Sequence, residues 1–240
     1  IVYCATRKNV ESVCQLLQDR GFSATRYHAG LPDQERQENQ EDFVYDRRRI
    51  MIATNAFGMG IDKSNVGYVV HYNMPKNLES YYQEAGRAGR DGEPADCILL
   101  YAPKDVQTAK FLILNAGENE ETSPEERTRL QTRDLERLDQ MVGFCKTTAC
   151  LRQYLLDYFG EHLAEPCGNC SSCQGNFVER DITVEAQKIL SGVARVERMY
   201  PYGLGVAQVI HMLRGSRNQR VLSLKLDTLP TYGILREVPR

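Results

Sequence analysis

The sequence predicts an α/β fold in which a parallel sheet carries helices on both faces, followed by a mainly helical region. Short β-rich runs alternate with helical stretches over residues 1 to about 102. A long amphipathic helix is expected from Pro124, and two or three short helices from Asp181. Strands that alternate with helices in this way form βαβ units, whose strands pair in parallel.

The strands are expected where β-branched and aromatic residues cluster between turn residues. Five segments meet this description: IVYC, SATRYHAG, RIMIAT, VGYVVHYNM and ADCILLYAP. The helical segments between them include KNVESVCQLLQDRG, DQERQENQEDFVY and NLESYYQEAGRAGR. The last of these ends in glycines, which places its arginines at a helix end or on the following loop.

A change of texture near residue 120 predicts a domain boundary. The segment NAGENEETS is acidic and turn-prone, and the helix after it brings four large apolar side chains near one face. These are Leu130, Leu135, Leu138 and Met141. A second helix, CLRQYLLDYFGE, runs into the polar segment EPCGNCSSCQGN. The expected domains are residues 1–120, 121–178 and 179–240.

Length and charge narrow the class of protein. The chain has 240 residues, more than one typical domain of roughly 100–150. Because 30 Lys and Arg face 32 Asp and Glu, the formal charge of -2 gives no global basic field for nucleic acid. Phosphate contacts would have to come from local basic patches, at residues 47–49 and 214–220.

The length of the apolar stretches and the first ten residues indicate in which cellular compartment the protein is expected. No apolar stretch approaches the roughly 20 residues that span a bilayer, and the start, IVYCATRKNV, does not resemble a leader peptide. We therefore expect a cytosolic protein without a membrane partner. The first residue is Ile rather than Met, which suggests that the sequence begins inside a longer protein.

Four of the eight cysteines crowd between Cys150 and Cys173. In CGNCSSC, two residues separate each of Cys167, Cys170 and Cys173, so three thiolates can converge from a tight loop. Cys150, at the start of a predicted helix, can complete a tetrahedron with Zn–S distances of about 2.3 Å. Four protein ligands leave no open position for water, so the expected metal is a structural zinc.

Other interpretations of this cluster remain open. An iron–sulfur cluster also takes four cysteines, and buried free cysteines behave as small apolar residues. Cys145 is close enough in sequence to compete with Cys150. We favour zinc at Cys150, because Gly168 and Asn169 make a poor core and only Cys150 leads directly into the helix before the knuckle.

The string QEAGRAGRDG, at residues 83–92, carries two arginines three positions apart among small residues. Such arginines can project from one side of a helix end. A guanidinium aimed at a γ-phosphate accelerates phosphoryl transfer by about 10³–10⁵, whereas the alternative for this string alone is a surface turn with salt bridges. If Arg87 and Arg90 face a nucleotide, we expect them near the carboxyl edge of the sheet and outside the lobe's interior.

A second string, IATNAFGMGIDKSNV at residues 52–66, follows from a predicted strand. Its glycines at 58 and 60 permit a tight turn at the carboxyl edge of a parallel sheet, where α/β proteins place ligands. Thr54 offers a hydroxyl group and Asp62 a carboxylate in the same loop.

Together with YCATRKNVE and YHAGL, these two strings resemble the second RecA-like lobe of superfamily-two helicases. ATNAFGMGIDKSNV and SYYQEAGRAGRDG resemble the RecQ family in particular, and the cysteine segment and LRGSRNQR extend this resemblance over essentially the whole chain. The resemblance implies a RecA-like lobe, a helical zinc-binding domain and a partial winged-helix domain. The match stops after TYGI, so the strands of the wing are expected to be missing.

The resemblance also implies a motor in which ATP and Mg²⁺ lie between two lobes and hydrolysis moves single-stranded DNA in the 3′→5′ direction. Arg90 would be the principal arginine finger, Arg87 a second phosphate or transition-state contact, and Gln83 a coupling residue near the nucleotide. Asp62 would lie near the ribose, with Gly60 in the same turn.

DNA would meet two other parts of the chain by the same resemblance. The contacts of the RecA-like lobe with the DNA backbone would come from Thr6, Arg7, His28, Gly30 and Thr54. The phosphate contacts of the winged helix would come from Arg214, Ser216 and Arg220, which lie near a predicted helix start where donors suit anions.

Two absences bear on activity. The sequence has no GxxxxGKS or GxxxxGKT phosphate loop and no DEAH-like carboxylate pair for Mg²⁺, so this chain by itself is expected to hydrolyse no ATP. An absent first lobe would hold most of the nucleotide. The leading hypothesis is part of an ATP-dependent DNA helicase of replication, recombination and repair that acts on single-stranded and forked duplex DNA in the cytoplasm, at the bacterial nucleoid. The alternatives are a catalytically idle nucleic-acid-binding module and an RNA-directed helicase.

Overall fold

A computed structural model describes residues 1–57, 63–115, 123–175, 177 and 180–238. The chain forms two compact units, Ile1–Gly175 and Asn176–Arg240. The first unit contains the sheet, the long helix and the cysteine cluster, and the second is helical.

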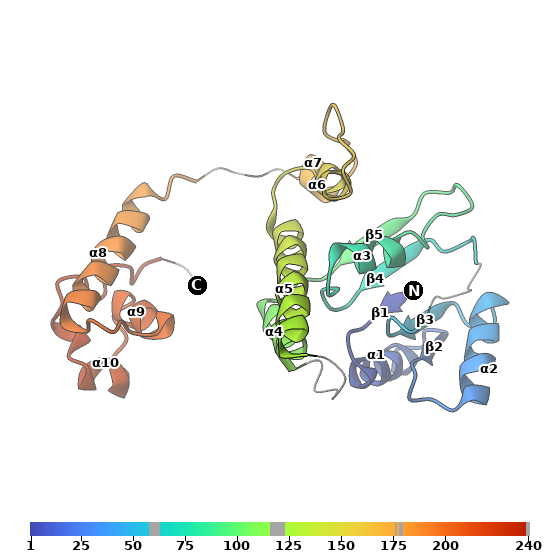
Figure 1. Cartoon of the computed structure of the whole chain (residues 1–240), viewed down its shortest axis with the longest axis horizontal. Coiled ribbons are helices and arrows are strands. Elements are labelled where there is room, and N and C mark those ends of the chain that lie inside the picture. The colour runs from blue at the N-terminus through green and yellow to red at the C-terminus, as the bar shows by residue number, and fades with distance from the viewer. Residues whose placement is uncertain (58–62, 116–122, 176, 178–179, 239–240) are drawn as a thin grey trace. The chain divides into compact units, whose positions relative to one another are not determined.

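Five parallel strands form the sheet of the first unit, in the order β2-β3-β1-β4-β5 (Figure 1). Their bounds are β1 Val2–Tyr3, β2 Ala24–Tyr27, β3 Ile50–Ala53, β4 Tyr68–His71 and β5 Asp96–Leu99. In the register, Val2 of the central strand lies between Ile52 and Val70. All five strands therefore end at one carboxyl edge, as the sequence predicts.

Helices α1 (Arg7–Asp19) and α2 (Asp33–Val44) pack on opposite faces of this sheet. Successive strand residues point to alternate faces, so Ile52 meets α1 whereas Ala53 meets the face of α2. The core on the α1 face contains Cys4, Val10, Val13, Cys14, Ala24 and Ile52. The core on the other face contains Ile1, Tyr3, Phe43, Met51, Ala53, Phe57, Val66 and Val69. The prediction of an α/β fold with helices on both faces is confirmed.

A third core joins the sheet to the long helix α5 (Pro124–Lys146) through α3 (Leu78–Ala85). It contains Met74, Leu78, Tyr81, Leu138, Met141 and Phe144. Helix α4 (Pro103–Asn115) packs beside α5. Leu138 and Met141 are fully buried as expected, but Leu130 is 39% exposed, so the apolar stripe of α5 covers only its second half.

The cysteine region continues from α5 through α6 (Leu151–Tyr158) to the single turn α7 (Ser171–Gln174). Gly168 has a φ of +65°, a backbone conformation that favours glycine, in the loop between them. This positive φ turns the chain so that its three closely spaced cysteines face the start of α6.

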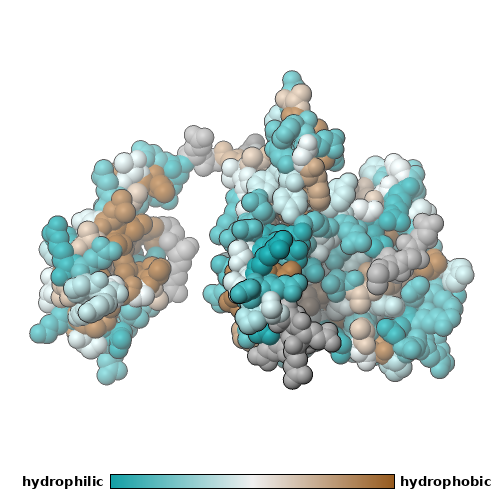
Figure 2. All heavy atoms as spheres, in the orientation of Figure 1, coloured by the Kyte–Doolittle hydropathy of each residue, from teal (hydrophilic) through white to brown (hydrophobic). Residues whose placement is uncertain are grey.

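The second unit packs three helices around one small core. Their bounds are α8 Thr183–Met199, α9 Val206–Leu213 and α10 Gln219–Ser223, and a 3-10 turn, η1, follows at Leu226–Thr228. The core contains Val196, Met212, Leu213, Val221, Leu226 and Leu235. Figure 2 shows apolar surface over α8 and α9, where Leu190 and Val206 are exposed.

None of the helices in the described parts of the chain is both long and apolar enough to cross a lipid bilayer. The longest of them, α5, carries charged side chains along its length.

Gly143 allows α5 and α6 to pack closely. A Cβ atom at this position would overlap the hydroxyl of Tyr154, which donates to the carbonyl oxygen of Gln140. We expect Gly143→Ala to destabilise the protein by about 1–2 kcal/mol, because overpacking outweighs the gain of about 1 kcal/mol in helix propensity. In a Tyr154→Phe background the same substitution should become neutral or stabilising. Urea denaturation of the four variants measures both values, and an equal effect in both backgrounds would refute this explanation.

Candidate functional site

The four predicted zinc ligands converge. The sulfur atoms of Cys150, Cys167, Cys170 and Cys173 all lie within 4.8 Å of one another, and those of Cys170 and Cys173 are 3.4 Å apart. Sulfur atoms on a tetrahedron with Zn–S distances of about 2.3 Å are separated by about 3.8 Å. The cluster therefore has the size that a tetrahedral metal requires.

Backbone amides point at these sulfur atoms. Leu151 N donates to Cys170 Sγ at 3.3 Å, and Cys167 N and Gln153 N donate to Cys150 Sγ at 3.3 and 3.4 Å. Burial opposes ionisation of Cys150 and Cys170, but the amides of Cys167 and Gln153 hold the pKa of Cys150 below its usual value, and those of Cys173 and Leu151, with the neighbouring thiols, lower that of Cys170 to about 6. Such donors stabilise thiolates, the form of cysteine that binds a metal.

Cys173 shows why a cation belongs in this cluster. Its hydrogen bond to Cys170 raises its pKa to about 12, so the four sulfur atoms do not all ionise at neutral pH by themselves. A bound divalent cation would offset the converging charges and deprotonate all four thiols. Cys145 lies outside the cluster: it packs against the core of α3 and α5, where burial raises its pKa to about 11.

The turn after α3 that carries Arg87 and Arg90, residues 86–92 and here called the arginine turn, does not lie at the carboxyl edge of the sheet. Gly89 N donates to Val66 O at 3.0 Å and Asp96 N donates to Gly67 O at 2.9 Å, and both acceptors precede β4. Because α3 follows the carboxyl end of β4 and runs back along the sheet, its end comes to the amino ends of β4 and β5. The expectation that this turn lies at the carboxyl edge was therefore wrong.

The two arginines also differ in exposure. Arg87 is only 9% exposed, so the expectation that both guanidinium groups lie outside the lobe's interior was wrong for this one. Its charge lies near the Tyr3 hydroxyl and opposes the rise in the pKa of that group, yet Arg87 Nε has no hydrogen-bond partner among the described residues. Arg90 is exposed and its Nε donates to Gly86 O at 3.2 Å, and Gln83 is exposed on α3.

Sequence reasoning missed Tyr3, which organises this corner. Burial raises its pKa to about 12, so its hydroxyl keeps its proton and donates to Phe57 O at 3.4 Å. Its ring stacks on His71, and His71 Nε2 lies 3.0 Å from a carboxylate oxygen of Glu84. A tyrosine in a β-rich run is ordinarily a core residue, so the sequence carries no signal for this contact.

Two predicted nucleotide-binding residues, Gly60 and Asp62, lie outside the described residues. The segments on either side of them contact Tyr3 or the arginine turn. Phe57 O accepts from Tyr3, the residue that contacts Arg87, and Val66 O accepts from Gly89.

The residues predicted to contact DNA from the RecA-like lobe follow three adjacent strands. Thr6 comes after β1, His28 after β2 and Thr54 after β3, so they share the carboxyl edge of the sheet. Thr6 Oγ1 accepts from Asn9 N and caps α1, which presents Arg7 in the first turn. These positions lie at the edge opposite to the arginine turn.

His28 is held inside the lobe. Its ring is 5% exposed, Gly30 N donates to its Nδ1 at 3.1 Å, and its Nε2 lies 2.7 Å from Glu11 Oε1. Both ring nitrogens of His28 are therefore engaged within the lobe. A Cβ on Gly30 would lie 3.1 Å from two atoms of the Arg7 side chain, so glycine leaves room for that guanidinium.

The predicted winged-helix contacts differ in their surroundings. Arg214 Nη1 donates to Val238 O at 2.9 Å and is thereby tied to the C-terminal part of its own unit. Ser216 Oγ accepts from Asn218 N, and Asn218 in turn caps α10. Arg220 is exposed on α10. The three residues therefore lie around one turn, but only Arg220 is exposed.

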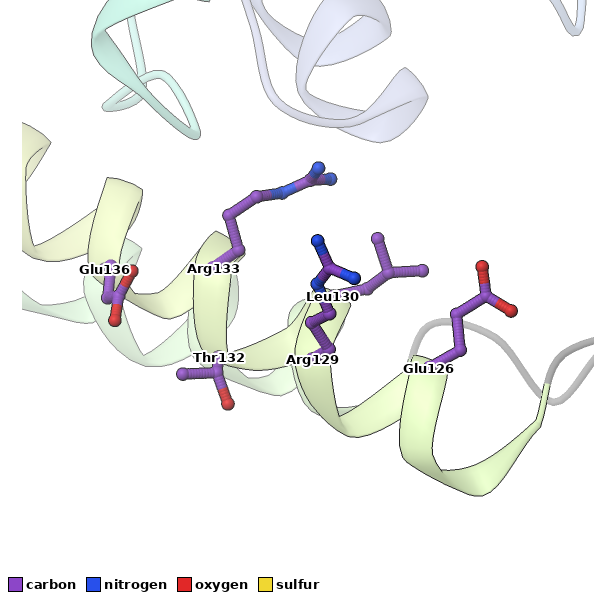
Figure 3. A pocket seen from close by; sticks show the side chains of 6 residues that line it. All are labelled: Glu126, Arg129, Leu130, Thr132, Arg133 and Glu136. Carbon is purple, nitrogen blue, oxygen red and sulfur yellow. The ribbon is translucent and has the colours of Figure 1, made fainter.

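An open hollow of about 600 Å³ lies along α5, away from all the predicted site residues. Figure 3 shows that Arg129 and Arg133 point to the same side, near Leu130. Glu126 and Glu136 also line the hollow and offset this positive charge. All six lining residues lie within one helix, whereas a phosphate loop presents the backbone amides of a turn, so the hollow is a poor candidate for nucleotide binding.

Comparison with protein families gives three matches in order along the chain. Residues 1–92 match a helicase conserved C-terminal domain, residues 103–174 a RecQ zinc-binding domain and residues 176–240 an RQC domain. The second match contains all four cysteines of the cluster, which confirms the prediction of structural zinc.

Similar proteins span almost the whole chain. An ATP-dependent DNA helicase RecQ of Bacillus subtilis is 44% identical over 98% of this chain and 38% of its own length. The protein of the same name from Haemophilus influenzae is 39% identical over 98% and 36%. A putative ATP-dependent RNA helicase of Acanthamoeba polyphaga mimivirus is 35% identical over 92% and 40%. The chain thus spans about two fifths or less of these relatives.

Removing zinc should unfold residues 145–176, because structural zinc contributes on the order of 10–16 kcal/mol to the folding of small peptides. We expect Cys150→Ser to abolish zinc binding and to expose this segment to proteolysis. Cys145→Ser is the matched control and should keep the metal, since Cys145 lies outside the cluster. Atomic absorption and limited proteolysis provide the measurements. Zinc loss in the Cys145 variant, or zinc retained in the Cys150 variant, would contradict the ligand assignment.

Proposed function

Because the chain belongs to the RecQ family of helicases, we propose that it provides the second motor lobe, the zinc-binding domain and part of the winged-helix domain of an ATP-dependent 3′→5′ DNA helicase. The proposed bounds of these domains are residues 1–120, 121–178 and 179–240. The order of the three family matches along one chain carries this proposal. The position of the arginines, which differs from expectation, does not.

The nucleotide is proposed to meet the corner formed by the arginine turn. ATP with Mg²⁺ would supply the reacting phosphoryl group, held mainly by a lobe outside this sequence. Arg90 is the principal arginine finger, Arg87 a second phosphate contact and Gln83 a coupling residue. Gly60 and Asp62 complete the site near the ribose.

The surroundings of Arg87 support this arrangement. A buried guanidinium with an unpartnered Nε is costly, since leaving a buried donor unsatisfied costs roughly 1–3 kcal/mol. An anion at this corner would satisfy that donor. The buried position of Arg87, with its charge near the Tyr3 hydroxyl, limits the conformations of this side chain before any ligand arrives.

DNA is proposed to run along the carboxyl edge of the sheet. Arg7 offers an exposed charge there, while Thr6, Gly30 and Thr54 offer backbone and hydroxyl groups beside it. His28 contributes by fixing the loop of Gly30, because both of its ring nitrogens are engaged within the lobe. Hydrolysis at one edge could then move a strand gripped at the other.

The second unit is proposed to bind duplex DNA at a fork. Ser216 and Arg220 lie on the surface turn that precedes and opens α10. Arg214 stabilises this turn through the hydrogen bond that it donates to the carbonyl oxygen of Val238. The second candidate function is action on RNA, since one similar protein is named an RNA helicase.

The chain should bind single-stranded and forked DNA weakly, and binding should weaken as salt rises because phosphate contacts release counterions. Arg7→Ala should lower the affinity and reduce the salt slope by about one. Arg20→Ala is the matched control, since Arg20 is an exposed arginine at the opposite end of α1. Fluorescence anisotropy with DNA and RNA strands of one sequence tests both candidates. Salt-independent binding would contradict the DNA proposal, and tighter binding of RNA would favour the alternative.

In a RecQ protein that combines this chain with a phosphate-loop lobe, Arg90→Ala should lower ATP turnover by about 10³ or more. Nucleotide affinity should change little, because the absent lobe holds most of the ligand. Arg90→Lys keeps the charge but loses the planar fork, so we expect it to recover only part of the rate. DNA-stimulated phosphate release and nucleotide binding are the measurements. Unchanged turnover in the alanine variant would remove Arg90 from the mechanism.

A further inference from the structure

Glu79, in the first turn of α3, connects the arginine-bearing helix to the zinc-binding region. Its Oε1 accepts from the hydroxyl of Tyr158 at 2.9 Å and forms an ion pair with Arg137 Nε at 3.2 Å. Tyr158 is the last residue of α6, and Arg137 lies on α5. Burial and the charge of Glu79 raise the pKa of Tyr158, so this hydroxyl remains a donor at neutral pH.

Two aromatic contacts reinforce this connection. The rings of Tyr81 and Phe144 lie 5.1 Å apart, as do those of Tyr82 and Phe159. Tyr81 and Tyr82 belong to α3, whereas Phe144 lies on α5 and Phe159 caps α6. Three residues within about one turn of α3, Glu79, Tyr81 and Tyr82, thus contact helices outside the sheet.

The zinc cluster orders the far end of α6. Cys150 is the N-cap of this helix, and its sulfur accepts from Gln153 N in the first turn. Leu151 N donates to the sulfur of Cys170, a second ligand. Helix α6 has eight residues, or about 12 Å, so Tyr158 lies one short rigid helix away from the metal ligands.

Helix α3 needs such support. It also has only eight residues, and a helix of this length is marginal by itself. Its first turn carries Glu79, and its end passes through Gly86 into Arg87. A tilt of α3 at Glu79 would therefore displace the arginine turn.

We infer that Glu79 is a positioning residue through which the zinc-ordered helix α6 fixes the orientation of α3 and of the arginine turn. Order imposed on Cys150 at the start of α6 would then reach the arginine turn through Tyr158 at the end of α6 and Glu79 on α3. This inference rests on the proposed function only for the role of Arg87 and Arg90. The contacts themselves are independent of any nucleotide.

Hydrogen exchange in the zinc-loaded chain, without nucleotide or DNA, tests this connection. Tyr158→Phe removes one hydroxyl, and we expect exchange in residues 78–92 to rise on the order of tenfold, the effect of one charged hydrogen bond. Exchange in β3, at residues 50–53, should not change. Tyr154→Phe is the matched control on the same helix: its hydroxyl bonds Gln140 on α5 and not α3, so residues 78–92 should keep their rates.

Glu79 and the metal provide two further comparisons. Glu79→Gln keeps an acceptor for Tyr158 and should change exchange less than Glu79→Ala. Zinc removal should raise exchange in residues 78–92 by a larger factor in the wild type than in Tyr158→Phe, because the variant has already lost the connection. Unchanged rates in Tyr158→Phe, an equal rise in β3, or equal factors on zinc removal would each overturn the inference. None of these results would bear on whether Arg90 contributes to hydrolysis.

Discussion

The packing of α3 between the sheet and α5 is the constraint on which the first unit depends. Tyr81 contacts His71 of β4 on one side and Phe144 of α5 on the other, with ring centroids 5.0 and 5.1 Å apart. Through this one helix, the sheet core and the core of the long helix become continuous. The arginine turn inherits its position from the same packing, since it begins where α3 ends.

This arrangement separates the two proposed ligand surfaces of the lobe. Strand exits after β1, β2 and β3 form the carboxyl edge, whereas the return of α3 brings Gly89 to the segment before β4. A rigid sheet lies between them.

Two buried histidine–glutamate pairs help to select a single conformation of the lobe. His28 and His71 are both almost fully buried, and each pairs through Nε2 with a glutamate, Glu11 and Glu84. Removing either partner would leave an unsatisfied buried group, so these pairs restrict which loop conformations are stable. The first pair fixes the YHAG loop, and the second fixes His71, on which the ring of Tyr3 stacks. The proposed function requires a single conformation of both.

The sequence by itself determined the parallel sheet, the zinc ligands and the family, because strand composition, cysteine spacing and strings such as QEAGRAGRDG are local properties. The resemblance alone grouped Thr6, His28 and Thr54, and the strand order shows that all three follow the carboxyl ends of adjacent parallel strands. Only the tertiary structure decided where Arg87 lies, that both ring nitrogens of His28 are engaged within the lobe, and that Glu79 meets Tyr158. These depend on how segments distant in the chain pack, and a residue's own neighbours in sequence carry no record of that.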